Sequence, residues 1–367
     1  MTAAPSYLET EEKGSIGTRP VSRKPSPGRL APLAALWRLV CFFGLVIALV
    51  FVMNALVGSG LRRIKTSSYG AWNRAMQGKV NADVIISGSS RAAYDYDPRV
   101  IEAVTGVSAF NLGRNGSQTD VQLAVLKAYL EHNRKPRLIV HSLDAFTFVT
   151  TREVYDPALY IPYLKDEQLY RPLRQINPNF FKSRYLPLYG YVVEDMNFSW
   201  VLGLGALLGW SPKENYFLGF SPQNRKWTGE FQKYQAANPE GVSFAVEPAG
   251  VQVLDQLIQL CQQNGIQLVF VYPPEYSEME AMTNNREQIF AKFKELATRA
   301  NVPIWDYSDW RYDGNRDLFY NSQHLNAGGA AIFSRDFADR LKSYFAEQAA
   351  AVRGSEASRQ ERSSAPN

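Results

Sequence analysis

Short apolar segments alternate with helix-like stretches over most of this chain, and this alternation limits the fold more than any other feature. The apolar segments have the length and the β-branched or aromatic content of buried strands, and the stretches between them repeat apolar residues at helical spacing. Strands separated by helices of this length form a parallel sheet covered by helices. The sequence therefore predicts a flavodoxin-like three-layer α/β sandwich with a five-stranded parallel sheet. The expected strands are 84–87, 107–111, 137–143, 266–272 and 302–307, and the expected helices are 121–132, 251–263, 285–300 and 327–345.

A second feature is a segment of 22 residues without a charge, 39–60, which is bracketed by Arg38 and by Arg62 and Arg63. A helix that crosses a bilayer needs ~20 residues. A buried core helix and a cleaved signal peptide are the alternatives, but the charged flanks and the long leader favour a retained transmembrane anchor. Because the leader is basic, the positive-inside rule favours a single-pass protein of a bacterial inner (plasma) membrane, with its domain outside the cytoplasm. The expected organisation is a disordered basic leader (1–38), the anchor (39–60), one α/β domain (61–346) and a disordered tail (347–367).

Charge and residue types exclude several classes of function. The net charge of +5 is concentrated in the leader, which carries +3, while the tail from Glu347 is neutral and the middle of the chain carries +2. So small a charge argues against nucleic acid as a partner. Two cysteines and three histidines provide neither a disulfide framework nor a Cys/His metal site, so we expect no metal and no cofactor.

An insertion, 150–250, separates the third and fourth expected strands and shows no clear periodicity. Its residues 155–234 hold 18 aromatic side chains in 80 positions. Aromatic rings could form a glycan cleft above the sheet, and the alternative is a second small core. The apolar segment 200–210 is too short to cross a bilayer and is expected to be a packed helix or a lid loop. The expected cleft residues are Tyr216, Phe217, Phe220 and Trp227.

Reactive side chains follow the expected strands at their carboxyl ends, where open parallel sheets bind ligands. The first strand leads into Gly88-Ser89-Ser90-Arg91, the second into a loop rich in glycine and amides (111–118), and His324 precedes the last helix. Histidine can activate serine, and backbone N–H groups can bind an oxyanion, so this set fits acyl transfer. Each feature alone has an ordinary explanation, such as a helix cap or a turn. Their order along one edge favours catalysis.

These segments resemble motif blocks of the SGNH (GDSL-type) hydrolase superfamily, in particular its membrane-anchored branch, which includes alginate O-acetylation proteins and the D-alanyl-transfer protein of teichoic acid modification. "IISGSSR" is similar to the first block, "NLGRNGSQ" to the second and "HLNAGGAAIFS" to the last. The resemblance covers about residues 83–345 apart from the insertion. It implies that Ser90 is the nucleophile, that His324 is the base, and that the N–H groups of Ser90 and Gly116 form the oxyanion hole. The α/β-hydrolase elbow is also half matched, but there the serine follows several strands.

Two positions depart from the family pattern. The asparagine that usually completes the oxyanion hole is replaced by Asp144, and the acid three residues before the histidine is replaced by Asn321. We therefore predict a Ser90–His324 dyad oriented by Asn321, with Asp317 or Asp144 as alternative acids.

The resemblance implies a membrane-anchored serine O-acyltransferase or esterase that acts on a cell-envelope polysaccharide, with a membrane acyl-transfer protein as a candidate partner. The alternative is a catalytically inactive SGNH-like domain that binds polymer or serves as a scaffold in an export or modification complex. The acyl group, its donor and the glycan stay open at this point. The residues expected to contact substrate are Arg91, Asn115, Tyr272 and Trp227.

Overall fold

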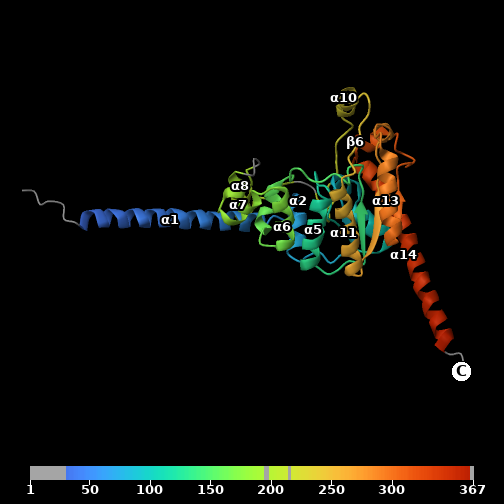
Figure 1. Cartoon of the computed structure of the whole chain (residues 1–367), viewed down its shortest axis with the longest axis horizontal. Helices are drawn as coiled ribbons and strands as arrows, with labels where there is room; N and C mark the ends of the chain where they lie inside the picture. Colours follow the sequence, from blue (N-terminus) through green and yellow to red (C-terminus); the bar gives the residue numbers. More distant parts are fainter. Residues whose placement is uncertain (1–29, 194–197, 214–215, 364–367) are drawn as a thin grey trace, which may run out of the picture. The chain divides into compact units, whose positions relative to one another are not determined.

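The structure is a computed structural model that describes residues 30–193, 198–213 and 216–363 (Figure 1). The chain divides into two compact units, Met1–Leu49 and Val50–Asn367. The α/β domain and the candidate site lie wholly within the second unit.

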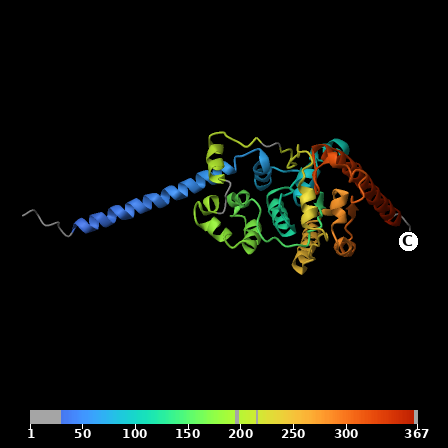
Figure 2. The same cartoon turned by 90° about the horizontal axis from the view of Figure 1, so that it is seen from above.

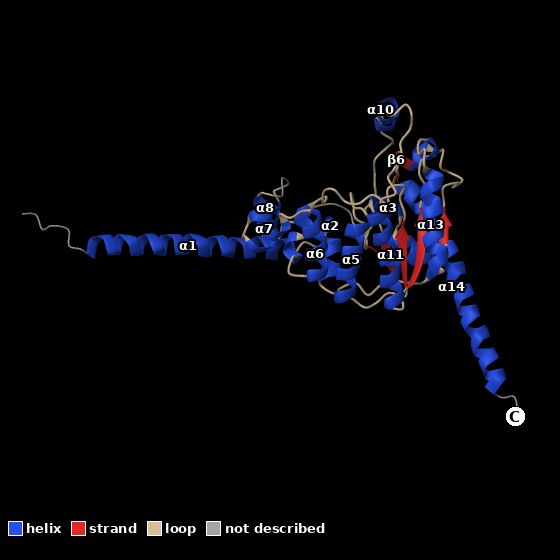
Figure 3. Ribbon diagram, viewed as in Figure 1, coloured by secondary structure: helices blue, strands red, loops and turns tan. Residues whose placement is uncertain are grey.

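A single five-stranded parallel sheet forms the middle of the domain (Figure 3). Its strands pair in the order β2-β1-β3-β4-β5, which is the flavodoxin-like order. The fold class predicted from the sequence is therefore confirmed. The strands are β1 (Val84–Ser87), β2 (Ala109–Asn111), β3 (Leu138–Ser142), β4 (Gln267–Tyr272) and β5 (Ile304–Asp306).

Helices cover both faces of the sheet because alternate strand residues point to opposite sides. On one face Ile85, Ile139 and Phe270 join the core beneath α5 (Thr119–His132), α11 (Pro248–Gln263) and α13 (Arg286–Ala300). On the other face Ile86, Val140 and Val271 join the core beneath α4 (Pro98–Thr105) and α14 (Ala327–Ser363). Seen from above, α14 lies on the opposite side from α11 and α13 (Figure 2).

Both long terminal helices extend beyond their predicted limits. Helix α1 (Leu30–Leu61) begins before the predicted anchor, and its segment Leu33–Leu61 is long and apolar enough to cross a membrane. Helix α14 continues to Ser363, into residues predicted to be disordered. Ala, Glu, Gln and Arg dominate the sequence of this extension, and these residues have a high intrinsic helix propensity. Most of the predicted leader (1–29) and the last residues (364–367) lie outside the described residues.

In its described parts, the insertion forms several short helices, which explains why it lacks a long period. Segment 200–210, expected to be a packed helix or a lid, is mostly helix α9, and it packs on the end of α1. A Cβ atom added to Gly60 would meet the Gly203 carbonyl oxygen at 1.7 Å, so the two helices touch backbone to backbone. The helical elements are η1 (Pro157–Leu159), η2 (Ile161–Tyr163), α6 (Glu167–Ile176), α7 (Phe180–Tyr185), α8 (Tyr189–Val192), α9 (Ser199–Leu207) and α10 (Glu230–Ala237).

Several small elements were not predicted from the sequence. Two of them matter for the site: α3 (Ser90–Asp95), which follows β1 directly, and the hairpin of β6 (Phe319–Asn321) with β7 (His324–Leu325). Elements this short show no periodicity that a sequence pattern could reveal. The others are α2 (Ser67–Met76), α4, α12 (Ser277–Ala281) and η3 (Arg316–Leu318).

Candidate active site

The turn from β1 into α3 explains the Gly-Ser-Ser sequence at this strand end. Gly88 has φ of +150°, and a Cβ atom there would meet the side chains of Ser142 at 2.7 Å and Ala92 at 2.9 Å. Only glycine fits such a close approach of strand and helix. Ser89 is the N-cap of α3, where its Oγ accepts the N–H of Arg91 (3.2 Å). Ser90 is therefore the first residue of the helix, and its own N–H has no acceptor within the helix.

A hairpin near the C-terminus brings the histidine to this serine. His324 and Asn321 face each other across β6 and β7. The His324 Nε2 atom lies 2.7 Å from Ser90 Oγ, and its Nδ1 atom lies 2.9 Å from Asn321 Oδ1. Ser90, His324 and Asn321 thus form a hydrogen-bonded chain with the geometry of a nucleophile, a base and an orienting residue. Asn321, not Asp317, occupies the third position.

The hydrogen bonds around Asn321 determine which imidazole nitrogen carries the proton. The backbone N–H of Gln323 also reaches Asn321 Oδ1 (3.1 Å), and an N–H can only donate, so this atom must be the amide oxygen. His324 Nδ1 must then donate its proton to that oxygen. In the neutral ring, Nε2 is left as an acceptor for the Ser90 hydroxyl, which is the tautomer that a general base requires.

His324 is held neutral by its surroundings. Burial, assisted by the positive charge of Arg91, lowers the pKa of His324 to about 3. Tyr320 stacks on the imidazole with ring centroids 5.3 Å apart, and Tyr94 meets it edge-on at 5.3 Å. The unfolded chain binds a proton at His324 near pH 6.5, whereas the folded chain binds it only near pH 3. The contribution of His324 to the free energy of unfolding is therefore at its full value above pH 6.5. Its contribution is lost as the pH falls from about 6.5 toward 3.

Arg91 is the centre of a buried charge cluster beneath the serine. Its side chain is 2% exposed, its Nη1 lies 2.6 Å from Glu275 Oε1 and 3.5 Å from Asp144 Oδ1, and its Nη2 donates to the Pro273 carbonyl. The Tyr272 hydroxyl donates to the same Glu275 oxygen (2.6 Å). This cluster ties α3 to the ends of β3 and β4. Arg91 and Tyr272 were predicted to contact substrate; both side chains are buried and bonded within the protein, neither lines the cavity described below, and the contact stays a prediction.

We expect Arg91→Ala to lower the free energy of unfolding by about 3–5 kcal/mol, because removing one member of a buried pair leaves Glu275 and Asp144 uncompensated. Chemical denaturation of the detergent-solubilised chain measures this. The control is Arg99→Ala, since Arg99 pairs with Asp97 but is 48% exposed, and the loss there should be under about 1 kcal/mol. If Arg91→Ala instead raises KM and leaves the free energy of unfolding unchanged, Arg91 contacts the substrate.

Three further acidic residues lie near the site, and their recorded hydrogen bonds are to parts of the chain other than the imidazole of His324. The Asp95 carboxylate accepts the N–H of Leu325 (3.1 Å) and so anchors the residue that follows His324. Asp317 is exposed in η3, just before β6, where its N–H donates to Asn315 Oδ1, and the structure does not bring it to the histidine. Asp144 donates its backbone N–H to Thr147 Oγ1 (2.8 Å), and burial raises the pKa of its carboxyl to about 6. The backbone N–H of Asp144 is therefore already bonded within the protein, and a role for Asp144 in the oxyanion hole stays a prediction.

The loop after β2 lies beside the nucleophile. Arg114 donates its backbone N–H to the Gly88 carbonyl (2.9 Å), which joins this loop to the serine loop. Gly116 forms a turn closed by Ser117, whose Oγ donates to the Arg114 carbonyl (2.8 Å). Tyr155 of the insertion lies against Gly116, so close that a Cβ atom there would meet its ring at 2.7 Å. The oxyanion role of the Gly116 N–H stays a prediction.

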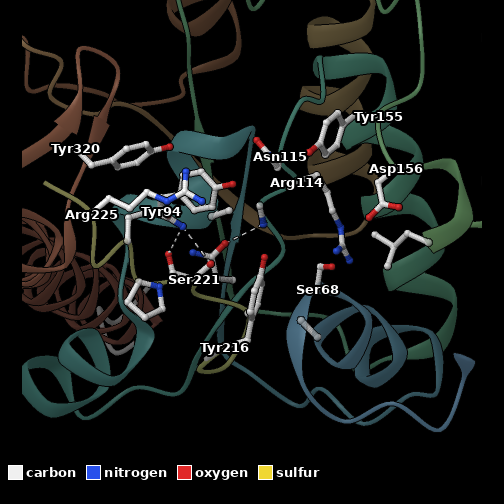
Figure 4. Close-up of a pocket in the computed structure, with 18 of the residues that line it drawn as sticks. Ser68, Tyr94, Arg114, Asn115, Tyr155, Asp156, Tyr216, Ser221, Arg225 and Tyr320 are labelled. Carbon is white, nitrogen blue, oxygen red and sulfur yellow. Dashed lines mark hydrogen bonds between the residues drawn. The ribbon is translucent and has the colours of Figure 1, made fainter. Parts of the chain in front are cut away.

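A cavity of about 720 Å³ opens next to this set of residues. Tyr94 and Tyr320, the two rings that contact His324, form part of its wall, and Asn115 lines it as predicted (Figure 4). Arg225 lies on the same side as these tyrosines, and Arg114 on the side of Tyr155 and Asp156. Tyr94, Tyr320 and both arginines could not be predicted as site residues, because nothing in their local sequence pattern separates them from other tyrosines and arginines of the chain.

The four aromatic residues of the predicted cleft lie in different environments. Tyr216 lines the cavity. Phe220 is 1% exposed in the core, and the ring of Phe217 lies 3.8 Å from the Arg99 guanidinium. Trp227 packs edge-on against Tyr276 with centroids 4.8 Å apart and does not line the cavity. Only one of the four residues is therefore placed to meet a substrate there.

Neither a family model nor a curated protein matches the sequence. Solved structures with a similar course of the chain include a candidate platelet activating factor from Streptococcus pneumonia, with 13% identity and a TM-score of 0.39 over 81% of this chain and 99% of that one. They also include an acetyl xylan esterase (12% identity, TM-score 0.35, 71% and 98% covered) and a candidate acylhydrolase from Bacteroides fragilis (10%, 0.34, 73% and 95%). The resemblance to SGNH hydrolases and to their membrane-anchored branch rests on the sequence motifs. Likeness this distant establishes no function by itself.

Proposed function

We propose that this protein is a membrane-anchored serine esterase or O-acyltransferase that acts on a cell-envelope polysaccharide. The observation that carries the proposal is the hydrogen-bonded chain from Ser90 through His324 to Asn321, with contacts of 2.7 Å and 2.9 Å. A serine that only packs or caps a helix does not require a neutral imidazole whose acceptor nitrogen faces the serine hydroxyl.

The proposed reaction follows from this geometry. As Ser90 Oγ attacks the acyl carbonyl carbon, its proton passes to His324 Nε2, and the N–H groups of Ser90 and Gly116 receive the developing oxyanion. The tetrahedral intermediate collapses, the C–O bond to the leaving alcohol breaks, and that alcohol takes the proton from Nε2. A second alcohol or a water then gives its proton to Nε2 and attacks the acyl carbon, the bond from that carbon to Ser90 Oγ breaks, and Oγ takes the proton back from Nε2. Water gives hydrolysis, and a sugar hydroxyl gives acyl transfer.

A fluorophosphonate probe tests the proposal, because it reacts only with an activated serine. We expect labelling of the purified chain at Ser90 and none in Ser90→Ala. Release of acetate from an acetylated oligosaccharide, and its transfer to an unacetylated one, separates the esterase from the transferase. Absence of both labelling and turnover in the folded protein would leave the inactive scaffold as the function.

The end of α1 supports a retained anchor over a cleaved signal peptide. Val57 and Leu61 are fully buried in the core of the α/β domain, so removal of α1 would open that core. Beside them, α9 and the residues after it expose large apolar side chains, among them Trp200, Leu208 and Trp210. Tryptophan is typical of the membrane–water interface, so this surface is suited to lie at the membrane where α1 leaves it.

We expect the protein to fractionate with membranes and to place residues from 65 onward outside the cytoplasm. An alkaline phosphatase fused after residue 346 should be active, because it folds only outside the cytoplasm, and a cytoplasmic reporter at the same position should be inactive. The reverse pattern would refute the proposed orientation. Release of the domain into a soluble fraction without α1 would refute the anchor.

A further inference from the structure

Arg114 is a buried cation without a counter-ion at contact distance. Its side chain lines the cavity and the residue is 6% exposed. Among the residues that the structure describes, no carboxylate lies within 4.0 Å of its guanidinium, no hydrogen bond to the guanidinium is formed, and Nε is buried without a partner. The guanidinium lies over the indole of Trp72, whose ring centre is 4.6 Å from Cζ.

A cation in this position costs free energy unless something pairs with it. Burying an unpaired charge is unfavourable, and a cation–π contact offsets only about 0.5–2 kcal/mol of that cost. Burial accordingly lowers the pKa of Arg114, although arginine keeps its proton in proteins. Asp156 attracts it from beyond ion-pair distance and lies at the same end of the cavity (Figure 4). The fold therefore holds a guanidinium that an anion could still pair with.

The frame around Arg114 is rigid. Trp72 is fully buried and packs edge-on against Tyr160 and Tyr163, with centroid distances of 5.8 Å and 6.1 Å. The backbone of Arg114 is bonded to Gly88 (2.9 Å). A guanidinium fixed in this way can make two parallel hydrogen bonds to a carboxylate or a phosphate at little cost in conformational entropy.

The other lining groups fit the rest of a sugar. Tyrosine hydroxyls and side-chain amides can bond to sugar hydroxyls, and tyrosine rings can pack on sugar faces. Arg225 supplies a second positive charge near Tyr320. Among the described lining residues one carries a negative charge, so the cavity bears a net positive charge. The tyrosines include Tyr94, Tyr155 and Tyr320, and the amides include Asn115, Gln223 and Asn224.

We propose that this cavity binds a sugar unit bearing an anionic oxygen group, and that Arg114 is the residue that pairs with the anion. The inference rests on the proposed function, since it names the class of polysaccharide that would reach Ser90. A carboxylate on the sugar ring and a phosphate substituent share the chemistry that Arg114 recognises.

Binding to the Ser90→Ala variant of the full chain, which cannot turn over an ester, tests the site by calorimetry. The probes are a galacturonic acid trimer, glucose 6-phosphate and maltotriose. We expect an anionic probe to bind more tightly than neutral maltotriose, and the better of the two anions identifies carboxylate or phosphate. In this background Arg114→Gln should weaken the binding of that anion by about 10–100-fold, as expected for hydrogen bonds to a charged group. Arg114→Lys should recover only part of the loss, because lysine keeps the charge but not the fork.

The melting temperature separates this proposal from a structural role for Arg114, because a structural role predicts that Arg114→Gln lowers it. Because the guanidinium lacks a counter-ion, Arg114→Gln should leave the melting temperature unchanged or raise it. Arg99→Gln, which changes an arginine outside the cavity, should leave anion binding unaffected. The inference is overturned if neither anion binds better than maltotriose, or if Arg114→Gln lowers the melting temperature and leaves anion affinity intact. If Arg114→Gln does not fold, the proposal requires that Arg225→Gln weaken the binding of the anionic probe. Failure of the proposed function is read separately, from fluorophosphonate labelling of Ser90.

Discussion

Replacing Ser90 by alanine should lower kcat for hydrolysis of a small acetyl ester by about 10⁴–10⁶-fold while the fold persists. Ser90 is the nucleophile of the hydrogen-bonded chain, and His324 is the base bonded to it among the residues that the structure describes. His324→Ala should therefore have an effect of similar size. Because the two residues act as one unit, the double variant should be hardly slower than either single variant.

Steady-state hydrolysis of an acetyl ester, together with circular dichroism to confirm folding, measures this. Ser343→Ala is a matched control, since Ser343 is an exposed serine on α14 and its hydroxyl bonds only to its own helix, at Asp339. Ordinary turnover in Ser90→Ala would show that the serine is not the nucleophile.

Replacing Asn321 by aspartate should raise kcat by as much as about 10⁴-fold, because the reverse change in a serine protease triad costs about that much. The carboxylate oxygen can still accept the proton of His324 Nδ1, so the productive tautomer is kept, and its charge stabilises the imidazolium that forms as serine attacks. In the native protein the pKa of His324 is lowered to about 3, which makes it a weak base, and low intrinsic esterase activity is expected for that reason.

The pH dependence checks the same contact independently of the rate. With Asn321 in place, the acid limb of kcat/KM should lie well below pH 6.5, since His324 stays neutral to low pH. In Asn321→Asp the neighbouring carboxylate raises the pKa of His324, so the acid limb should move to higher pH. Asp317→Asn is the control, because Asp317 does not contact the imidazole, and it should shift neither value. A fall in kcat with an unmoved acid limb in Asn321→Asp would show that Asn321 does not orient the histidine.

The sheet and its catalytic edge could be predicted because their signals are local. Each strand is a short apolar run between a turn and a helix, and parallel strands bring their carboxyl ends to one edge whatever their order. Ser90 lies at such a strand end, Asn321 and His324 lie in the long connection that follows β5, and the structure brings all three together. Gly88-Ser89-Ser90 combines a close strand–helix approach, a helix cap and the candidate nucleophile.

Side chains at the same edge could not be assigned from position alone. Arg91 and Tyr272 follow strands just as Ser90 does, yet they face inward and bond to Glu275. Whether a strand-end side chain meets solvent or a buried partner depends on the strand beside it and on the loop that covers it. That information comes from contacts between residues far apart in the sequence.

The sequence by itself determined the layered α/β fold, the apolar helix near the N-terminus and the serine, histidine and asparagine of the candidate site, because period, composition and spacing act over a few residues. Only the tertiary structure decided that Asn321, and not Asp317, meets the histidine, which aromatic side chains line the cavity and which arginine there is left without a counter-ion at contact distance. The physical reason is that hydrogen bonds and charges are paired across the folded chain. Arg114 pairs with neither of its chain neighbours, and its lack of a counter-ion becomes visible only when Trp72, Asp156 and the insertion surround it.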